Sequence, residues 1–317
     1  MSRACSACYA RSVIREQSVR SFTLAAHSPD PELANGALMI ARLEYPGLDA
    51  RPYLEQLDAL GLEARKRLAD ASVSACDVPT GVDPERYARV MALNDYLFTD
   101  LQFVGNSTNY EDPRNSCLNE VLDRRTGIPI TLALLYIEVA RRAGLEIQGI
   151  NFPGHFLLRC PSECGQFYSQ DLIIDAFHGG ALLSAGACQE LLRRRQGPED
   201  PLDDVAFQSQ AFSRATKPQI LARMLLNLKR IYERMHSFPQ ARDVTELLLA
   251  VDPSSRAELR DRGLLAYHVR DFSAALRDLE AYLRFPAPSS LDDEERQENE
   301  QIWEHVKTLR RRLAMLN

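Results

Sequence analysis

Residues Tyr110 to Leu145 read YEDPRNSCLNEVLDRRTGIPITLALLYIEVARRAGL and carry the strongest structural pattern in the chain. Its first part, NSCLNEVLDRR, has the pattern of a short helix, and Thr126-Gly127 interrupts it. Its second part, PITLALLYIEVARRAGL, is strongly apolar and ends at Gly144, a residue type that commonly closes helices. The stretch therefore predicts a short helix, a break and a long buried helix.

Three short apolar segments, EIQGINF, HFLLRC and LIIDAF, follow the long helix and are rich in Ile, Leu and Phe. Pro-Gly, Pro-Ser and Gly-rich breaks separate them, which is typical of short strands. Consecutive strands after a helix favour an antiparallel sheet. We therefore predict an α+β core over residues 109–195.

The segments on either side of this core differ from it in pattern. Residues 22–108 carry apolar side chains at helical spacing, as in PYLEQLDALGLEARKRLAD, and predict an N-terminal helical segment. Residues 1–21 are basic without a continuous apolar run, so we expect a disordered tail and no secretory signal. Residues 196–215 are charged, contain prolines and predict a linker.

The last part of the chain, residues 216–317, is helical in pattern and repeats itself. Phe238 and Ala241 recur 34 residues later as Phe272 and Ala275. A helix–turn–helix unit of this length with a small residue in its second helix resembles the tetratricopeptide repeat. We predict an all-α repeat stack closed by a capping helix that carries Trp303.

The composition disfavours several classes of protein. Of the 317 residues, 45% are hydrophobic and 26% are charged, which is typical of globular proteins and not of disordered or fibrous ones. The net charge of −6 disfavours nucleic-acid binding, and no apolar run approaches the roughly 20 residues of a membrane span. Seven cysteines, an odd number, favour a reducing compartment such as the cytoplasm over a disulfide scaffold.

One pair of residues in the core has the spacing of a catalytic pair. His155 stands at the turn into the second predicted strand, and Asp175 stands on the third. Adjacent antiparallel strands would place the imidazole beside the carboxylate, which is the base-and-orienter half of a nucleophilic triad. The alternative is a purely structural hydrogen bond that staples the two strands.

The long stretch quoted above, together with FPGHFLLR and IIDAFHGG, resembles the transglutaminase-like, or papain-like, fold. The resemblance is closest to the bacterial SirB-type transglutaminase-like proteins and covers about residues 22–290. That family carries an N-terminal helical segment and often C-terminal tetratricopeptide repeats. The resemblance therefore implies the same α+β core and the same domain order for this chain, without implying an established reaction.

The resemblance also implies where the triad of such a fold would lie. With the helix end at Arg141 and Gly144 as the anchor, the slot of the nucleophilic cysteine falls on Pro129, while His155 and Asp175 match the other two positions. Proline has neither a thiol nor a backbone N–H. The substitution would remove the nucleophile and one oxyanion-hole donor, so we expect a degenerate triad and a noncatalytic protein.

Other residues offer weaker catalytic chemistry. Cys117 lies among apolar neighbours on the preceding helix, where a cysteine is usually part of the core. A hydroxyl would need His155 within hydrogen-bond reach. Cys160 and Cys164 with His155 or His178 are candidate zinc ligands, but no second cysteine pair follows, so we expect no metal and no cofactor. The hydroxyl candidates are Ser116, Thr126 and Thr131.

A polar run before the proline has two interpretations: loop and helix capping with surface ion pairs, or the lining of a groove that binds a peptide or carboxylate. Arginine suits a carboxylate, and asparagine pairs with peptide backbone. The function that the sequence favours is a protein-interaction or regulatory module, which takes a protein or peptide partner in the repeat groove and a second segment near His155. The alternative is a hydrolase or acyltransferase that uses His155 and Asp175 with an unconventional nucleophile. The oligomeric state stays open. The candidate binding residues are Arg114, Asn115, Asn119, Arg125 and His155.

Overall fold

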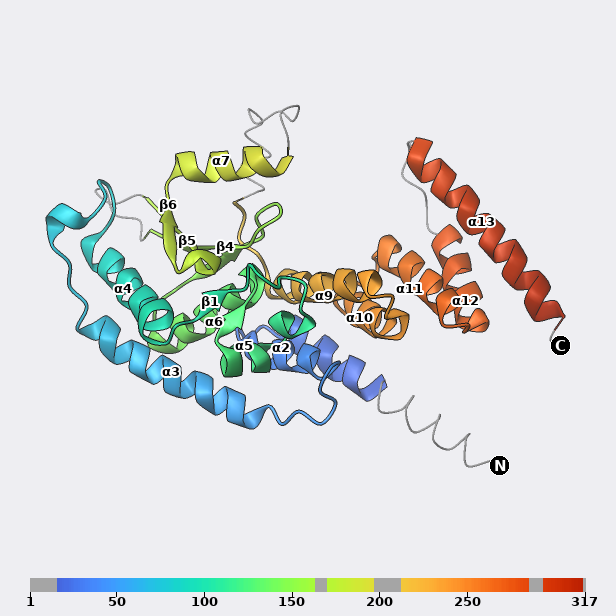
Figure 1. The fold of residues 1–317 in the computed structure, drawn as a ribbon, viewed down its shortest axis with the longest axis horizontal. Helices are drawn as coiled ribbons and strands as arrows, with labels where there is room; N and C mark the ends of the chain where they lie inside the picture. Colours follow the sequence, from blue (N-terminus) through green and yellow to red (C-terminus); the bar gives the residue numbers. More distant parts are fainter. Residues whose placement is uncertain (1–15, 163–169, 197–211, 285–292, 316–317) are drawn as a thin grey trace. The chain divides into compact units, whose positions relative to one another are not determined.

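The computed structural model describes residues 16–162, 170–196, 212–284 and 293–315 of the chain. These residues belong to two compact units (Figure 1). One unit comprises residues 28–224, and the other combines residues 1–27 with residues 225–317. The first unit holds both the helices of the predicted N-terminal segment and the predicted α+β core.

The ends of the predicted tail and linker are only partly described. Residues 16–27 form a helix, so helical structure begins before residue 22, where the sequence pattern placed its start. The rest of the predicted tail, residues 1–15, and most of the predicted linker, residues 197–211, lie outside the described residues, as does Cys164.

Three α-helices precede the core, in the order α2 (Ala34–Ala41), α3 (Arg51–Ala69) and α4 (Pro84–Asn94). A short 3₁₀ turn, η1 (Ala75–Asp77), lies before α4, which begins with Pro84 and is capped by Asp83, whose carboxylate accepts two backbone N–H groups. The chain then continues into a π-helix, η2 (Asp95–Asp100). Such π turns inside helical segments often lie at functional sites.

The predicted long helix is α6 (Pro129–Ala143), and it forms the centre of the core. Nearly all of its side chains are buried, and it packs against α3 and against the sheet (Figure 1). Gly144 ends it with φ of +80°, a conformation that glycine adopts without strain. The short helix before the break is α5 (Leu118–Arg124).

The sheet has four antiparallel strands in the order β3 (Gln148–Ile150), β4 (Leu157–Cys160), β5 (Leu172–Asp175) and β6 (Ala181–Leu183). The three predicted strands are β3, β4 and β5, and the predicted α+β class with an antiparallel sheet is confirmed. The sequence pattern did not reveal β6, which follows the Gly179-Gly180 turn.

Two very short strands form a separate parallel pair beside this sheet. They are β1 (Val104–Gly105) and β2 (Thr126–Gly127), and the pair was not predicted. Gly105 is required here, because a Cβ at this position would lie 2.5 Å from the carbonyl oxygen of Phe177. The remaining elements of this unit are the 3₁₀ turns η3 (Pro113–Ser116) and η4 (Ala176–His178), and α7 (Ala185–Gln196).

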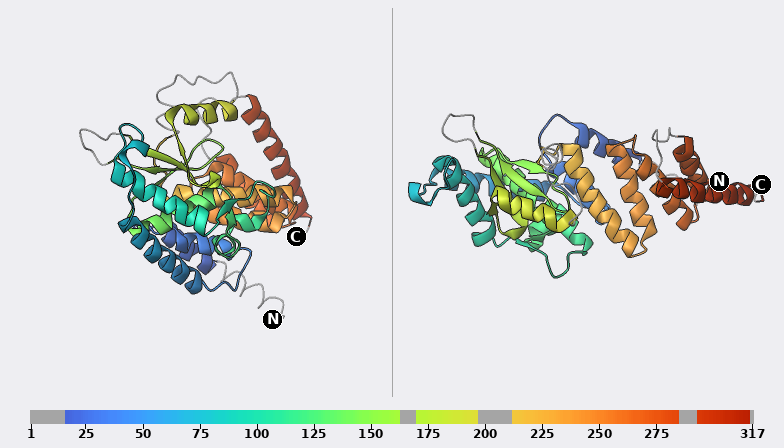
Figure 2. Two further views of the ribbon diagram at one scale, coloured as in Figure 1. Left: turned by 60° about the vertical axis from the view of Figure 1, so that its left-hand side comes forward. Right: turned by 90° about the horizontal axis from the view of Figure 1, so that it is seen from above.

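The C-terminal helices are α9 (Lys217–Arg234), α10 (Phe238–Val251), α11 (Arg256–His268), α12 (Phe272–Arg284) and α13 (Asp293–Ala314). Phe238 and Phe272, which are 34 residues apart, are the first residues of α10 and α12. From α10 onward, each helix packs against the next one along the chain (Figure 2). The repeat pattern in the sequence therefore corresponds to repeated helical hairpins, as predicted.

Small residues allow these helices to approach closely. Ala241 and Ala275 are fully buried, and a Cβ on Gly263 of α11 would lie 2.7 Å from a methyl group of Leu279 on α12. The last helix buries Ile302, Val306 and Leu309 against the repeat core. Within the described residues, no helix is both long enough and apolar enough to cross a bilayer.

Candidate functional site

The structure brings His155 and Asp175 together. His155 lies in the turn that leads into β4, and Asp175 is the last residue of the adjacent strand β5. The imidazole Nε2 lies 2.9 Å from the carboxylate Oδ2, and both side chains are buried. The strand order predicted this pairing, since neighbouring antiparallel strands place such residues side by side.

Asp175 also caps the turn that follows it. Its Oδ1 accepts the backbone N–H groups of Phe177 at 3.0 Å and of His178 at 3.4 Å. Its Oδ2 lies 2.8 Å from Nδ1 of His178, so two imidazoles meet the same carboxylate oxygen. Burial raises the pKa of Asp175, but the hydrogen bonds and charges of His155 and His178 outweigh it and hold this pKa below its usual value.

Aromatic side chains enclose this cluster. The ring of Phe177 stands edge-on to His155 at 6.2 Å between centroids and to Tyr110 at 6.3 Å. His155 is buried beneath this contact, whereas 65% of the His178 side chain is exposed. Solvent therefore reaches the cluster from the His178 side.

Pro129 begins α6 and is buried. The next polar side chain is Thr131, whose Oγ1 accepts the N–H of Ile128 at 3.1 Å and lies 2.8 Å from the carbonyl oxygen of Asn115, to which it donates. The hydroxyl of Thr131 is therefore hydrogen-bonded to backbone groups at the start of α6. Within the described residues, no cysteine, serine or threonine side chain makes a hydrogen bond to His155.

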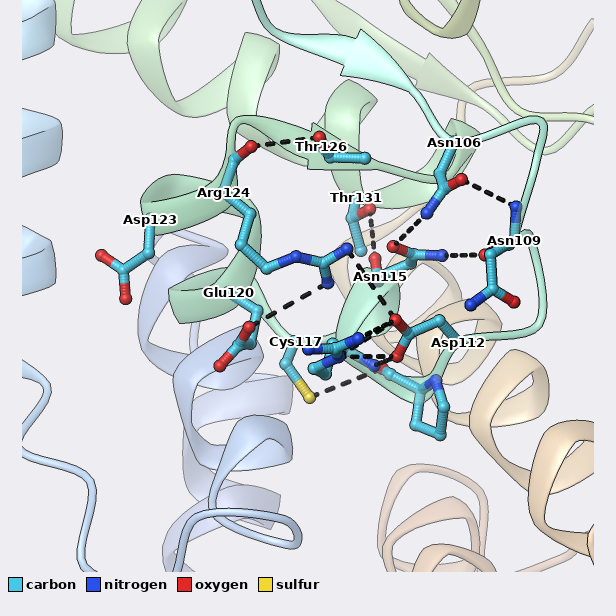
Figure 3. Close-up of polar contacts among 12 residues, drawn as sticks. Asn106, Asn109, Asp112, Asn115, Cys117, Glu120, Asp123, Arg124, Thr126 and Thr131 are labelled. Atoms are coloured by element: carbon cyan, nitrogen blue, oxygen red, sulfur yellow. Dashed lines mark hydrogen bonds and ion pairs between the residues drawn. The ribbon is translucent and has the colours of Figure 1, made fainter.

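The polar run before α6 folds into a cluster around Asn115 (Figure 3). Asn115 Nδ2 donates to the carbonyl oxygen of Asn109 at 2.8 Å, and its Oδ1 accepts from Asn106 Nδ2 at 3.1 Å. The side chain of Asn115 is fully buried. Its hydrogen bonds therefore hold the loop together, which is a structural use of a residue that the sequence proposed for binding.

The other candidate binding residues differ in their contacts and burial. Arg114 makes a bidentate ion pair with Asp112, in which its Nε donates to Oδ1 at 3.0 Å and its Nη2 donates to Oδ2 at 2.7 Å. These bonds lower the pKa of Asp112 despite its burial. Arg125, in the left-handed region with φ of +54°, donates to the carbonyl oxygen of Leu101. Asn119 is buried, and its Oδ1 has no hydrogen-bond partner within the described residues.

The buried thiols are held in the protonated state. Burial raises the pKa of Cys117 to about 12 and those of Cys160 and Cys188 to about 11. The charge of Asp175 adds to the shift of Cys188. Because the thiolate is the nucleophilic form, these three thiols are poor nucleophiles at neutral pH.

Two residues of this region lie outside the predicted catalytic and binding residues: His178, which the sequence offered only as a partner of Cys160 and Cys164, and Asn94. His178 joins the cluster because the turn η4 brings it back to Asp175, and the spacing Asp-x-x-His was the available signal. Asn94 hydrogen-bonds to the carbonyl oxygen of Gly180, which closes the same turn, from 86 residues away. No local pattern points to so distant a contact.

Comparisons with known proteins agree with this architecture. Residues 51–226 match the model of the transglutaminase-like superfamily, and residues 228–311 match a tetratricopeptide-repeat model. A UPF0162 protein of Xylella fastidiosa strain Temecula1 is 38% identical over 261 residues, which cover 82% of this chain and 86% of that protein. F-box only protein 21 of Mus musculus is 32% identical over 184 residues, 56% of this chain and 28% of that protein.

Among solved structures, the crystal structure of menin, described as revealing the binding site for Mixed Lineage Leukemia protein, matches with a TM-score of 0.44 and 11% identity. The match covers 93% of this chain and 70% of that chain. The family assignment rests on the sequence matches, which span both the core and the repeats. This chain belongs to the transglutaminase-like superfamily, is homologous to the UPF0162 proteins and carries C-terminal tetratricopeptide repeats.

Proposed function

We propose that this chain is a noncatalytic, SirB-type member of the superfamily that works as a protein-interaction or regulatory module. Tetratricopeptide repeats generally mediate contacts between proteins, and the repeat region would supply one binding surface. The surface around Tyr110 and His178 of the core would supply a second one. We also propose the domain limits and the cytoplasmic location predicted above. The proposal includes no nucleic-acid partner.

The single observation that carries the proposal is the composition of the His155 site. A base and its orienting carboxylate are in place at 2.9 Å, and within the described residues no thiol or hydroxyl hydrogen-bonds to the base. By the resemblance described above, Pro129 at the start of α6 would take the place of the nucleophile, and it has neither the thiol nor the N–H that acyl transfer uses. Loss of one oxyanion donor alone typically costs about 10²–10³ in rate.

The chemistry of the cysteines supports the same proposal. Cys117, Cys160 and Cys188 are buried and hold their protons at neutral pH, so an alternative thiolate is not supplied by any of them. The hydroxyl of Thr131 is bound to backbone groups at the start of α6. The hydroxyl of Thr126 donates to the carbonyl oxygen of Arg124 at 3.0 Å. The buried hydroxyl of Ser116 has no hydrogen-bond partner within the described residues, so it makes no hydrogen bond to His155 either.

Exposed aromatic side chains suggest where partners bind. Trp303 on α13 is 46% exposed, and Tyr110 beside the His155 site is 43% exposed. Tryptophan and tyrosine are enriched among the residues that dominate binding energy at protein interfaces. Of the candidate binding residues from the sequence, Arg114 and Arg125 are exposed, and the side chain of Arg114 is 55% exposed.

The test is affinity capture with the full chain, followed by cross-linking mass spectrometry to identify the residues that touch each partner. We expect Trp303→Ala and Tyr110→Ala each to reduce capture of a partner by at least about tenfold, since such anchors contribute more than 1 kcal/mol. Leu62→Ala on α3 is the matched control, because Leu62 is a comparably exposed apolar residue, 57% exposed. Thermal unfolding curves identical to wild type establish that each variant is folded.

Two results would overturn this proposal. One is an identical set of captured partners for wild type, Trp303→Ala and Tyr110→Ala. The other is hydrolysis of amide or ester substrates by the wild-type chain that disappears in His155→Gln, which would favour the hydrolase alternative instead.

A further inference from the structure

We propose that His155, Asp175 and His178 form a binding site for a divalent transition-metal ion of the zinc class. The inference goes beyond the interaction module proposed above and does not depend on it. It uses the second imidazole, which neither a catalytic triad nor a strand staple requires.

The three side chains present one ligand atom each to a common point. His155 Nε2 and His178 Nδ1 lie 2.9 and 2.8 Å from Asp175 Oδ2, and all three ligand atoms lie within 4.8 Å of one another. They come from the turn before β4, the end of β5 and the turn η4. Within the described residues, no other three His, Cys, Asp or Glu side chains converge in this way.

The charge of the cluster favours a cation. Asp175 is buried, and within the described residues no lysine or arginine pairs with it. Its partners are two imidazoles and two backbone N–H groups. Buried carboxylates are normally paired with a full positive charge or coordinate a metal ion. A divalent ion that displaces the protons between the imidazoles and the carboxylate would supply that charge.

The spacing is close to what a zinc ion needs. Bonds of about 2.0–2.2 Å in tetrahedral geometry separate ligand atoms by about 3.3 Å. The distances from Asp175 Oδ2 to His155 Nε2, now 2.9 Å, and to His178 Nδ1, now 2.8 Å, would therefore each increase by about half an ångström. His178 is the residue that would move, because 65% of its side chain is exposed whereas His155 is buried.

The remaining contacts resemble the support that metal ligands usually receive. The backbone N–H groups of Phe177 and His178 hold the second oxygen of Asp175, which fixes the orientation of the carboxylate. With three protein ligands, a fourth position would face solvent on the His178 side and would hold water. Two imidazoles and one carboxylate suit zinc, cobalt or nickel and not magnesium or calcium, which prefer oxygen ligands.

The test uses the full chain, prepared without metal, and titrates it with Zn²⁺ by calorimetry and with Co²⁺ by visible absorption. We expect wild type to bind one ion per chain at this site, and Co²⁺ to give a tetrahedral absorption spectrum. His178→Ala should weaken binding by at least about tenfold, as even outer-shell changes do. Because His178 is exposed, this variant is expected to fold. His27→Ala is the matched control, since His27 is an exposed histidine outside the cluster.

A second measurement distinguishes zinc bound at this site from zinc bound by cysteine thiols. Zn²⁺ should raise the thermal unfolding temperature of wild type and of His27→Ala but not of His178→Ala, because an ion that binds only the folded chain stabilises it. Equal zinc affinity and equal thermal shift in wild type and His178→Ala would overturn the proposal, since the ion would then bind elsewhere. Failure of wild type to bind either ion would overturn it as well, and would leave the interaction module unaffected.

Discussion

Asn94 hydrogen-bonds through its Nδ2 to the carbonyl oxygen of Gly180 at 2.8 Å, and so joins the end of α4 to the turn beside the His155 site. The other half of its amide, Oδ1, accepts the hydroxyl of Tyr136 on α6 at 3.0 Å. Gly180 in turn donates its N–H to the carbonyl oxygen of Asp175 at 2.9 Å. The buried amide thus ties the position of Asp175 to two helices of the core.

We expect Asn94→Ala to lower the free energy of unfolding by about 1–3 kcal/mol, because it leaves the hydroxyl of Tyr136 and the carbonyl oxygen of Gly180 without their partner. Urea unfolding followed by circular dichroism measures the change. Asn35→Ala on α2 is the comparison, since Asn35 makes its side-chain bond to Glu32 in a partly buried setting. An Asn94→Ala variant as stable as wild type would show that this network does not hold the turn.

Gly180→Ala should be more damaging than its size suggests. Gly180 has φ of +77°, which costs an alanine about 1 kcal/mol or more, and a Cβ there would lie 2.4 Å from Oδ1 of Asn94. We predict a loss of stability of about 2 kcal/mol or more. Gly47→Ala is the matched control, because a Cβ at Gly47 meets nothing within 4 Å and its φ is not positive. Equal unfolding curves for the two variants would contradict the described turn.

Gly263→Ala tests the repeat region in a similar way. The new methyl group would lie 2.7 Å from Leu279, so α11 and α12 would have to move apart or Leu279 would have to adopt a strained rotamer. Overpacking of this kind typically costs about 1–3 kcal/mol. Gly186→Ala at the start of α7 is the control, because its nearest neighbour is 3.9 Å away. The midpoint temperature of thermal unfolding should fall for Gly263→Ala and not for Gly186→Ala. An unchanged midpoint for Gly263→Ala would contradict the close approach of α11 and α12.

The low pKa of Asp175 predicts how acid affects stability. A carboxyl whose pKa is lower in the folded chain than in the unfolded chain, where it is about 3.9, stabilises the fold above that value. This contribution is lost as the pH falls through the folded pKa. The difference in unfolding free energy between wild type and Asp175→Asn should therefore be larger at pH 6 than at pH 3.5.

The control for this measurement is Asp95→Asn, which changes an exposed carboxyl of the same compact unit. Its unfolding free energy should follow that of wild type at both pH values. A difference between wild type and Asp175→Asn that stays constant from pH 6 to pH 3.5 would contradict the depressed pKa.

Much of this fold is predictable because the deciding signals are long or periodic. The continuous apolar run of α6 has one interpretation, a buried helix, and Gly144 marks its end. The recurrence of Phe238 as Phe272 marks equivalent helix starts in the repeats. The pairing of His155 with Asp175 follows from two adjacent antiparallel strands.

The parts that sequence reasoning missed depend on short or distant contacts. Strands β1 and β2 have two residues each, too few to show any alternation, and the close approach of Gly105 to Phe177 joins residues 72 positions apart in the sequence. Nothing near Asn94 in the sequence indicates that its amide binds a turn 86 residues later. The residue type of Asn115 fits both binding and loop capping, and the sequence did not indicate its hydrogen bonds to Asn106 and Asn109, which depend on the path of the loop.

His155 should have no nucleophile to activate, and covalent labelling of the chain is the decisive test. The full chain would be treated with a vinyl sulfone, which reacts with thiols, and with a fluorophosphonate, which reacts with activated hydroxyls, and the labelled residues would be mapped by mass spectrometry. We expect the same labelled positions in wild type and in His155→Gln, with the exposed Cys76 among those labelled by the vinyl sulfone. A cysteine, serine or threonine that is labelled in wild type and unlabelled in His155→Gln would contradict it.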